Sequence, residues 1–143
     1  MEPTSAITEN LKQVVPFLGV TDMERSLRFY IDGLGFTKKH QWVPDGELRW
    51  CWLTRGGASL MLREYLADRP PEGVLGQGVS LCFQCEDAVA LYREFRSRSI
   101  EANEPFVGNS MWVTVLSDPD GYKLDFESLT DAPEETKLSE VEA

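Results

Sequence analysis

Hydrophobic and polar residues alternate along residues 112–127, on both sides of the turn Asp118-Pro119-Asp120-Gly121. Proline presets the backbone angle at the second position of such a turn, and glycine tolerates its exit conformation. Because strand side chains alternate with a period of two, this β-hairpin has two distinct faces. Counting outward from the turn pairs Ser117 with Tyr122 and Thr114 with Asp125. It places Val113, Val115, Leu124 and Phe126 on the core face, and Trp112, Thr114, Lys123, Asp125 and Glu127 on the other.

The same hairpin pattern occurs 64 positions earlier, in residues 49–63, where Gly57 falls on Gly121 and Leu60 on Leu124. The core face of this first hairpin carries Cys51, Leu53, Leu60 and Leu62. The offset also holds far from the hairpins, since Leu27 falls on Leu91. We therefore interpret the chain as two copies of one unit.

The remaining segments complete each unit as strand, helix and three strands. In the first unit we expect a strand at 14–20, a helix at 23–30 capped by Thr21 or Asp22, and a strand at 37–43. In the second unit we expect a strand at 78–84, a helix at 87–98 and a weak strand at 103–107. The predicted division is a leader at 1–12, a first module at 13–66, a linker at 67–77, a second module at 78–129 and an acidic tail at 130–143.

These elements predict an α+β fold, in which two βαβββ modules form a cupped, mostly antiparallel eight-stranded sheet with two main helices on the outside. The helices need the aliphatic face of each sheet, which leaves the other face free. Two such sheets curled together would enclose an aromatic-rich pocket. The predicted free face carries Val15, Phe17, Trp50, Trp52, Ser59, Met61, Arg63, Val79, Leu81, Phe83, Trp112, Thr114, Asp125 and Glu127.

Composition excludes some classes of function. The formal net charge is −10, and no basic stripe is present, so nucleic acid is not an expected partner. No window resembles a membrane span or a secretion signal, which favours a cytoplasmic protein without membrane contact. The three cysteines lack disulfide or zinc spacing, and Cys51 and Cys82 fall on predicted core faces, as expected of small apolar residues in a reducing compartment.

Residues 20–30, 33–36 and 118–126 resemble the vicinal oxygen chelate superfamily, which contains glyoxalase I, extradiol dioxygenases and the fosfomycin and bleomycin resistance proteins. The resemblance covers about residues 13 to 128 and implies paired βαβββ modules around a cupped sheet. Metal-dependent members place ligands on the first and fourth strands of each module. Mapped onto this sequence, those positions are Val15, Met61, Val79 and Asp125.

One carboxylate, one thioether and two valines do not supply the oxygen or imidazole ligands that divalent cations take. The single histidine, His40, lies on the second predicted strand and cannot replace them. We therefore expect neither a metal nor another cofactor. Asp125 remains open to two interpretations, as a charge that orients a ligand or as a carboxylate satisfied by Thr114 or an arginine.

Large rings and charges on the free face suit a small-molecule pocket, although the same rings could fill the gap between closed sheets, and Arg63 could pair with Asp125 or Glu127. The predicted ligand-binding residues are Phe17, Trp50, Trp52, Met61, Arg63, Phe83, Trp112 and Asp125. The resemblance is closest in character to the bleomycin resistance type. It implies a homodimer that sequesters a bulky cationic or aromatic drug-like compound in crevices between chains.

Two alternatives compete with this hypothesis. One is an enzyme of the same superfamily, a lyase, isomerase or dioxygenase in which Asp125 acts as a base or as a residual metal ligand. Burial among tryptophans would raise the pKa of Asp125 toward neutrality, as proton transfer requires. The other is a structural or regulatory module whose cup is filled by its own side chains.

Overall fold

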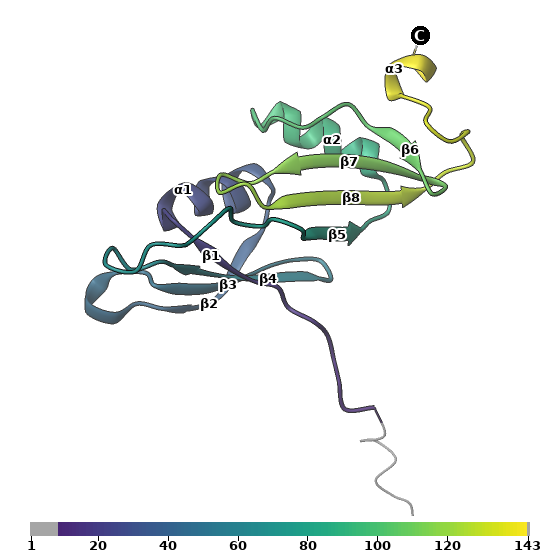
Figure 1. Cartoon of the computed structure of the whole chain (residues 1–143). Helices are drawn as coiled ribbons and strands as arrows, with labels where there is room; N and C mark the ends of the chain where they lie inside the picture. The colour runs from purple at the N-terminus through teal and green to yellow at the C-terminus, as the bar shows by residue number, and fades with distance from the viewer. Residues whose placement is uncertain (1–8, 143) are drawn as a thin grey trace, which may run out of the picture.

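A computed structural model describes residues 9–142 and shows two modules of similar topology (Figure 1). The first eight residues of the predicted leader and Ala143 lie outside the described residues. The predicted α+β class of paired βαβββ modules is confirmed, and the eight strands are divided between two four-stranded sheets. Within the described part of the chain, no helix combines the length and the apolar character needed to cross a membrane.

The first module ends its helix in an unusual way. Asp22 caps the helix by accepting a hydrogen bond from the Arg25 amide, and the helix then widens into a π-helical turn. Strand β1 runs parallel to β4, the other pairs are antiparallel, and the sheet order is β1-β4-β3-β2. The elements are β1 (Phe17–Val20), α1 (Met23–Leu27), the π-helical turn η2 (Arg28–Gly33), β2 (Thr37–Trp42), the 3-10 turn η3 (Pro44–Gly46), β3 (Trp50–Arg55) and β4 (Ala58–Glu64).

The second module repeats this arrangement in the order β5-β8-β7-β6, which confirms the internal repeat. Its elements are β5 (Ser80–Gln84), α2 (Ala88–Ser97), β6 (Phe106–Gly108), β7 (Met111–Ser117) and β8 (Lys123–Leu129), followed by the short helix α3 (Leu138–Val141). Asp87 caps α2 through the Ala90 amide, as Asp22 caps α1. The segment predicted as an acidic tail runs beside β6, where the Glu135 and Leu138 amides donate to backbone carbonyls.

The predicted face assignment of the first sheet is correct. Strand β4 pairs with β3 so that Met61 lies opposite Trp52, and Arg63 lies opposite Trp50. Phe17 of β1 is the parallel neighbour of Met61, so it shares their face. The other face buries Cys51, Leu53, Leu60 and Leu62 completely. Val15, however, precedes β1 and belongs to neither face.

The predicted register of the second hairpin is wrong by one residue. Ser117 pairs with Lys123, so a five-residue loop separates the strands, and Thr114 lies opposite Phe126 instead of Asp125. The cause is the Asp118 carboxylate, whose Oδ1 accepts hydrogen bonds from the backbone amides of Asp120 and Tyr122, each at 2.9 Å. A slip of one residue moves a strand's side chains to the opposite face.

The corrected register moves two predicted free-face residues, Trp112 and Thr114, to the face that α2 covers. Thr114 is fully buried there, and its hydroxyl donates to the Ala88 carbonyl of α2 at 2.8 Å. Asp125 and Glu127 stay on the open face, where they are neighbours of Val113 and Val115.

Strand β5 was also assigned to the wrong faces. Leu81 and Phe83 lie beside Leu124 and Phe126 on the helix-covered face, whereas Cys82, predicted to be in the core, is exposed beside Asp125. Val79 precedes the strand and is 56% exposed. The first strands of the two modules are offset by 65 positions, from Phe17 to Cys82, whereas the fourth strands keep the expected 64, from Met61 to Asp125. The second module is therefore one residue shorter between its first and fourth strands than the constant offset assumed.

The helix-covered faces of both sheets contribute to one hydrophobic core. Phe83 stacks on Phe126 with ring centroids 4.8 Å apart, and Phe36 of the first module meets the Phe83 ring edge-on. Tyr30 of η2 crosses between the modules, since its hydroxyl donates to Asp118 at 2.8 Å. The modules therefore fold as one unit, and both open faces are turned away from this core.

Candidate functional site

The open face of the first sheet gathers aromatic side chains, because alternate residues of four strands point the same way. His40 lies opposite Trp52, which lies opposite Met61, and Phe17 completes that row; Trp42, Trp50 and Arg63 form the next row. Phe17 is 53% exposed and Trp42 57% exposed, so these rings contact solvent in the isolated chain. We call this surface the aromatic face, defined by Phe17, His40, Trp42, Trp50, Trp52, Met61 and Arg63.

Trp52 lies at the centre of the aromatic face. The His40 ring meets it edge-on at 5.8 Å, and the Lys39 Nζ lies 5.3 Å from its ring centroid. Its indole Nε1 is buried and has no hydrogen-bond partner among residues 9–142. An unsatisfied buried N–H is costly, so Trp52 would gain stability if a rearrangement of the side chains that cover it brought an acceptor to this donor.

Two members of the aromatic face were missed by the sequence analysis, His40 and Trp42 of β2. The strand itself was predicted, but its register was not, because an irregularity between Lys38 and His40 shifts the pairing with β3. The signal was the single histidine followed two residues later by a tryptophan, which is the spacing of side chains on one strand face.

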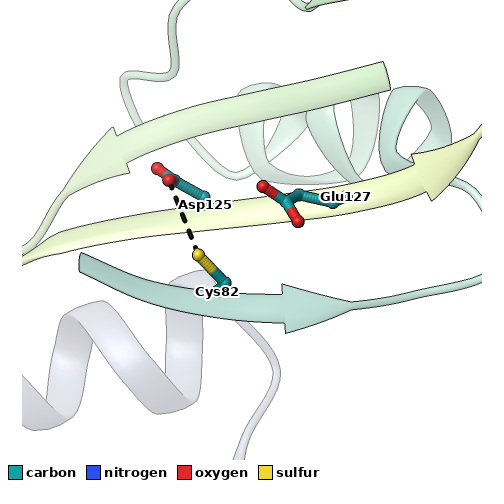
Figure 2. Close-up of side chains that lie close together, drawn as sticks. All are labelled: Cys82, Asp125 and Glu127. Carbon is teal, nitrogen blue, oxygen red and sulfur yellow. Dashed lines mark hydrogen bonds between the residues drawn. The ribbon is translucent and has the colours of Figure 1, made fainter. Parts of the chain in front are cut away.

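The open face of the second sheet is acidic, and Figure 2 shows Asp125 and Glu127 of β8 with Cys82 of β5. By the register of these two strands, neither contributes an aromatic ring to this face. Cys82 of β5 and Asp125 of β8 are direct neighbours, with Sγ and Oδ2 3.9 Å apart. Gln84, the next outward residue of β5, donates to Glu127 at 2.7 Å. We call the surface formed by Cys82, Gln84, Asp125 and Glu127 the acidic face.

Burial and charge within the acidic face raise the pKa values of Asp125 and Cys82. Partial burial raises the pKa of Asp125, and the neighbouring Glu127 carboxylate raises it further, whereas Lys123 and the Cys82 thiol oppose the shift. Burial and the same two carboxylates raise the pKa of the Cys82 thiol. Cys82 is therefore a protonated thiol near neutral pH, and the two carboxylates gain from a nearby cation.

The structure permits a test of whether a superfamily-type metal would fit. The neighbouring positions on the first and fourth strands are Phe17 with Met61 and Cys82 with Asp125, instead of the predicted Val15 and Val79. Cys82, Asp125 and Glu127 place one possible ligand atom each within 4.8 Å of one another. The first pair supplies neither oxygen nor imidazole, and the raised pKa of the thiol opposes metal binding by Cys82. The full four-ligand set therefore does not fit this chain.

Two predicted ligand residues, Trp112 and Phe83, lie outside both faces, and Arg63 of the aromatic face lacks its predicted ion pair. Arg63 is exposed and forms no ion pair within residues 9–142, so the predicted pairing with Asp125 or Glu127 does not occur in the single chain. Trp112 is half-buried on the face that α2 covers. Phe83 lines a cleft of about 960 Å³ beside β5, which contains neither Trp52 nor Asp125.

Comparison with known proteins shows which fold this arrangement shares. The family described as the Glyoxalase/Bleomycin resistance protein/Dioxygenase superfamily matches residues 10–126. Among curated proteins, no sequence matches the chain.

Three solved structures illustrate the likeness in fold. TnmS3, an antibiotic binding protein from Streptomyces sp. CB03234, is 22% identical with a TM-score of 0.63, over 83% of this chain and 98% of its own. A bleomycin-binding protein complexed with bleomycin is 24% identical with a TM-score of 0.66, over 82% and 98%. A bleomycin resistance determinant encoded on the transposon Tn5 is 24% identical with a TM-score of 0.67, over 85% and 100%.

Proposed function

The chain belongs to the Glyoxalase/Bleomycin resistance protein/Dioxygenase superfamily, and from this starting point we propose that it binds and sequesters a planar, cationic small molecule without the help of a metal ion. The observation that carries the proposal is the pairing of an aromatic face on one sheet with an acidic face on the other. The solved structures whose names record antibiotic binding or bleomycin binding support it.

The aromatic face supplies the apolar part of recognition. Rings of a planar ligand stack on Trp50, Trp52 and Phe17, and each aromatic or cation–π contact contributes about 0.5–2 kcal/mol. Met61 fills the space between the rings, because a flexible thioether adapts to irregular shapes.

The acidic face supplies the charge. A ligand ammonium or guanidinium placed between Asp125 and Glu127 relieves the repulsion that raises the pKa of Asp125. The two faces belong to different sheets, and both are turned away from the core of their own chain. We therefore infer that the protein is a homodimer in which the aromatic face of one copy meets the acidic face of the other, which gives two equivalent sites.

A second candidate function is catalysis by Asp125 as a general base, in an isomerase, lyase or dioxygenase of the same superfamily. The observation that favours it is the raised pKa of Asp125, which results from burial and from Glu127. The Glu127 carboxylate lies on the same face, with an oxygen within 4.8 Å of the Asp125 carboxylate, so it is the second group that would exchange a proton with a substrate.

The exposed free cysteine Cys82 suits a reducing compartment, and we place the protein in the cytoplasm on that basis. Phe17 and Trp42 of the aromatic face are 53% and 57% exposed in the single chain, which argues against a module that fills its own cup.

The test uses purified full-length protein and bleomycin. Metal content is measured first by mass spectrometry, and binding is then followed by tryptophan fluorescence and calorimetry. We expect saturable binding without bound metal, weakened at least about tenfold (about 1.4 kcal/mol) by Trp52→Ala. Trp112→Phe on the helix-covered face is the matched control and should bind normally. Stoichiometric metal would refute metal independence, and equal binding by both variants would refute the aromatic face as the site.

A further inference from the structure

The aromatic face carries positive charge without a compensating carboxylate. Its cations are Arg63 of β4, which lies opposite Trp50, and Lys39 of β2, whose Nζ lies 5.3 Å from the centroid of the Trp52 ring. Both side chains are exposed, and neither forms an ion pair within the part of the chain that the structure describes. Because the whole chain has a formal net charge of −10, this face differs in sign from the average of the molecule.

An irregularity of β2 brings Lys39 onto this face. Successive side chains of a regular strand point to opposite faces, so the sheet would normally separate Lys39 from His40. The pairing of β2 with β3 shifts between Lys38 and His40, however, and Lys39 and His40 both lie beside the Trp52 ring. Irregularities of this kind re-aim a side chain and are frequent next to active sites. This one adds a cation to the aromatic face that regular alternation would have placed on the other side.

The acidic residue of the first sheet is committed elsewhere. Strands β1 to β4 contain one carboxylate, that of Glu64. It accepts hydrogen bonds from the Met23 amide at 2.8 Å and from the Arg49 guanidinium at 2.9 Å. Glu64 follows Arg63 directly in β4, so its side chain starts from the opposite face of the sheet. The four strands therefore place no carboxylate beside Arg63 or Lys39.

A ligand that covers the aromatic face would remove water from these two cations. A desolvated cation without an anionic or hydrogen-bonding partner is costly. Lys39 also occupies the cation–π position over Trp52, so a ligand cation placed there would meet a like charge. The acidic face has the opposite sign, through Asp125 and Glu127 (Figure 2). The two faces thus favour opposite charges on the two parts of one ligand.

We propose that the ligand is bipolar, with a carboxylate or another acidic oxygen group on the planar part that stacks on the aromatic face, in addition to its cation. Arg63 binds the acidic group, because a planar guanidinium matches the two oxygens of a carboxylate. Lys39 leaves the Trp52 ring and adds a second charge-assisted hydrogen bond, while the ligand cation lies at Asp125 and Glu127. The inference rests on the proposed function and names the class of its ligand, a planar aromatic acid that also carries an amine.

The first test compares two compounds that differ only in the acidic group, 9-aminoacridine and its 2-carboxylic acid. Both have the same planar ring system and the same protonated amine. Their binding to purified full-length protein is measured by calorimetry at pH 7 and low ionic strength. We expect the carboxylate to bind at least about tenfold more tightly, as one added hydrogen bond between charged groups predicts. Equal affinities, or weaker binding of the carboxylate, overturn the inference.

The second test removes the cations one at a time. Lys38→Gln is the matched control for Arg63→Gln and Lys39→Gln, because Lys38 lies opposite the core-face residue Leu53 and loses the same charge. Arg63→Gln should abolish the advantage of the carboxylate, while 9-aminoacridine keeps its affinity within about twofold. Lys39→Gln should weaken the carboxylate and strengthen 9-aminoacridine, since the Trp52 ring is freed. An equal loss of both compounds in Arg63→Gln, or loss of the advantage in the control, overturns the inference.

The outcomes separate this inference from the function on which it rests. Binding of 9-aminoacridine with no advantage for the carboxylate overturns the bipolar ligand and leaves the proposed function intact. If neither acridine nor bleomycin binds, both the inference and the proposed function are refuted.

Discussion

Replacement of Tyr30 by phenylalanine removes the hydroxyl that joins the two modules. That hydroxyl donates to Asp118 Oδ2 at 2.8 Å, and both residues are buried. The aromatic contacts with Phe29 and Phe36 are retained in the variant, because the ring is unchanged. The change therefore isolates one buried hydrogen bond between positions 88 residues apart in the sequence.

The expected loss of stability follows from the charge of the acceptor. A hydrogen bond to a charged group contributes about 1.5–3 kcal/mol, against about 1 kcal/mol for a neutral pair. In Tyr30→Phe, Asp118 keeps the amide hydrogen bonds of Asp120 and Tyr122 and needs no rearrangement. We expect the free energy of unfolding to fall by about 2 kcal/mol at pH 7.

The loss should also depend on pH. Burial raises the pKa of Asp118, and the Tyr30 hydroxyl partly opposes that rise by bonding the carboxylate. Because the native state then holds the Asp118 proton more tightly than the unfolded state, this group lowers stability as the pH rises from its unfolded pKa through its folded pKa. Tyr30→Phe raises the pKa of Asp118 in the folded state further. The difference in unfolding free energy between the wild type and the variant therefore grows as the pH rises through that window, and it is smallest at acidic pH.

Urea unfolding of both proteins, followed by fluorescence at several pH values from acidic to neutral, measures the deficit. Tyr92→Phe is the matched control, since Tyr92 is half-buried on α2 and its hydroxyl has no hydrogen bond among residues 9–142. The free energy of unfolding of Tyr92→Phe should lie within about 0.5 kcal/mol of that of the wild type. A Tyr30→Phe deficit below that value, or one that is the same at every pH, would refute the reasoning.

Three further outcomes are expected. Thr114→Val should lower the free energy of unfolding in urea by about 1–2 kcal/mol, because the buried Ala88 carbonyl loses the Thr114 hydroxyl that donates to it at 2.8 Å. An unchanged free energy of unfolding would mean that Thr114 lies on the open face. Bleomycin affinity, measured by calorimetry, should fall as the pH drops through the raised pKa of Asp125, and Asp125→Asn should lose that dependence. Hydrogen bonding to Arg55 lowers the pKa of Glu94, so the stability that this pair contributes should be lost as the pH falls through the lowered pKa. Because the pair is partly exposed, Glu94→Gln should lower the free energy of unfolding by at most about 1 kcal/mol at pH 7, and it should have no effect at a pH below the pKa of Glu94.

The alternation of polar and apolar residues, together with the repeat, was sufficient to predict the fold. In the first hairpin, the alternation placed Trp52 and Met61 on the same face correctly, and the structure pairs them across the two-residue turn of Gly56 and Gly57. The caps were predictable for the same local reason, since an aspartate before an apolar helix bonds the amide three residues later. Interactions within a few residues of one another decide these features, and a single sequence displays them.

The second hairpin depended on contacts that no local pattern displays. Asp118 organises a five-residue loop while it also accepts the Tyr30 hydroxyl, so a residue of the other module helps to hold the register that buries Thr114. The loop is one residue longer than predicted. Because side chains alternate with a period of two, Val113 instead of Trp112 lies on the open face. The hydrophobic pattern of residues 111–116 fits either register, since both faces of β7 carry apolar side chains. Packing against α2 and the neighbouring module therefore selects the face that a ligand would meet.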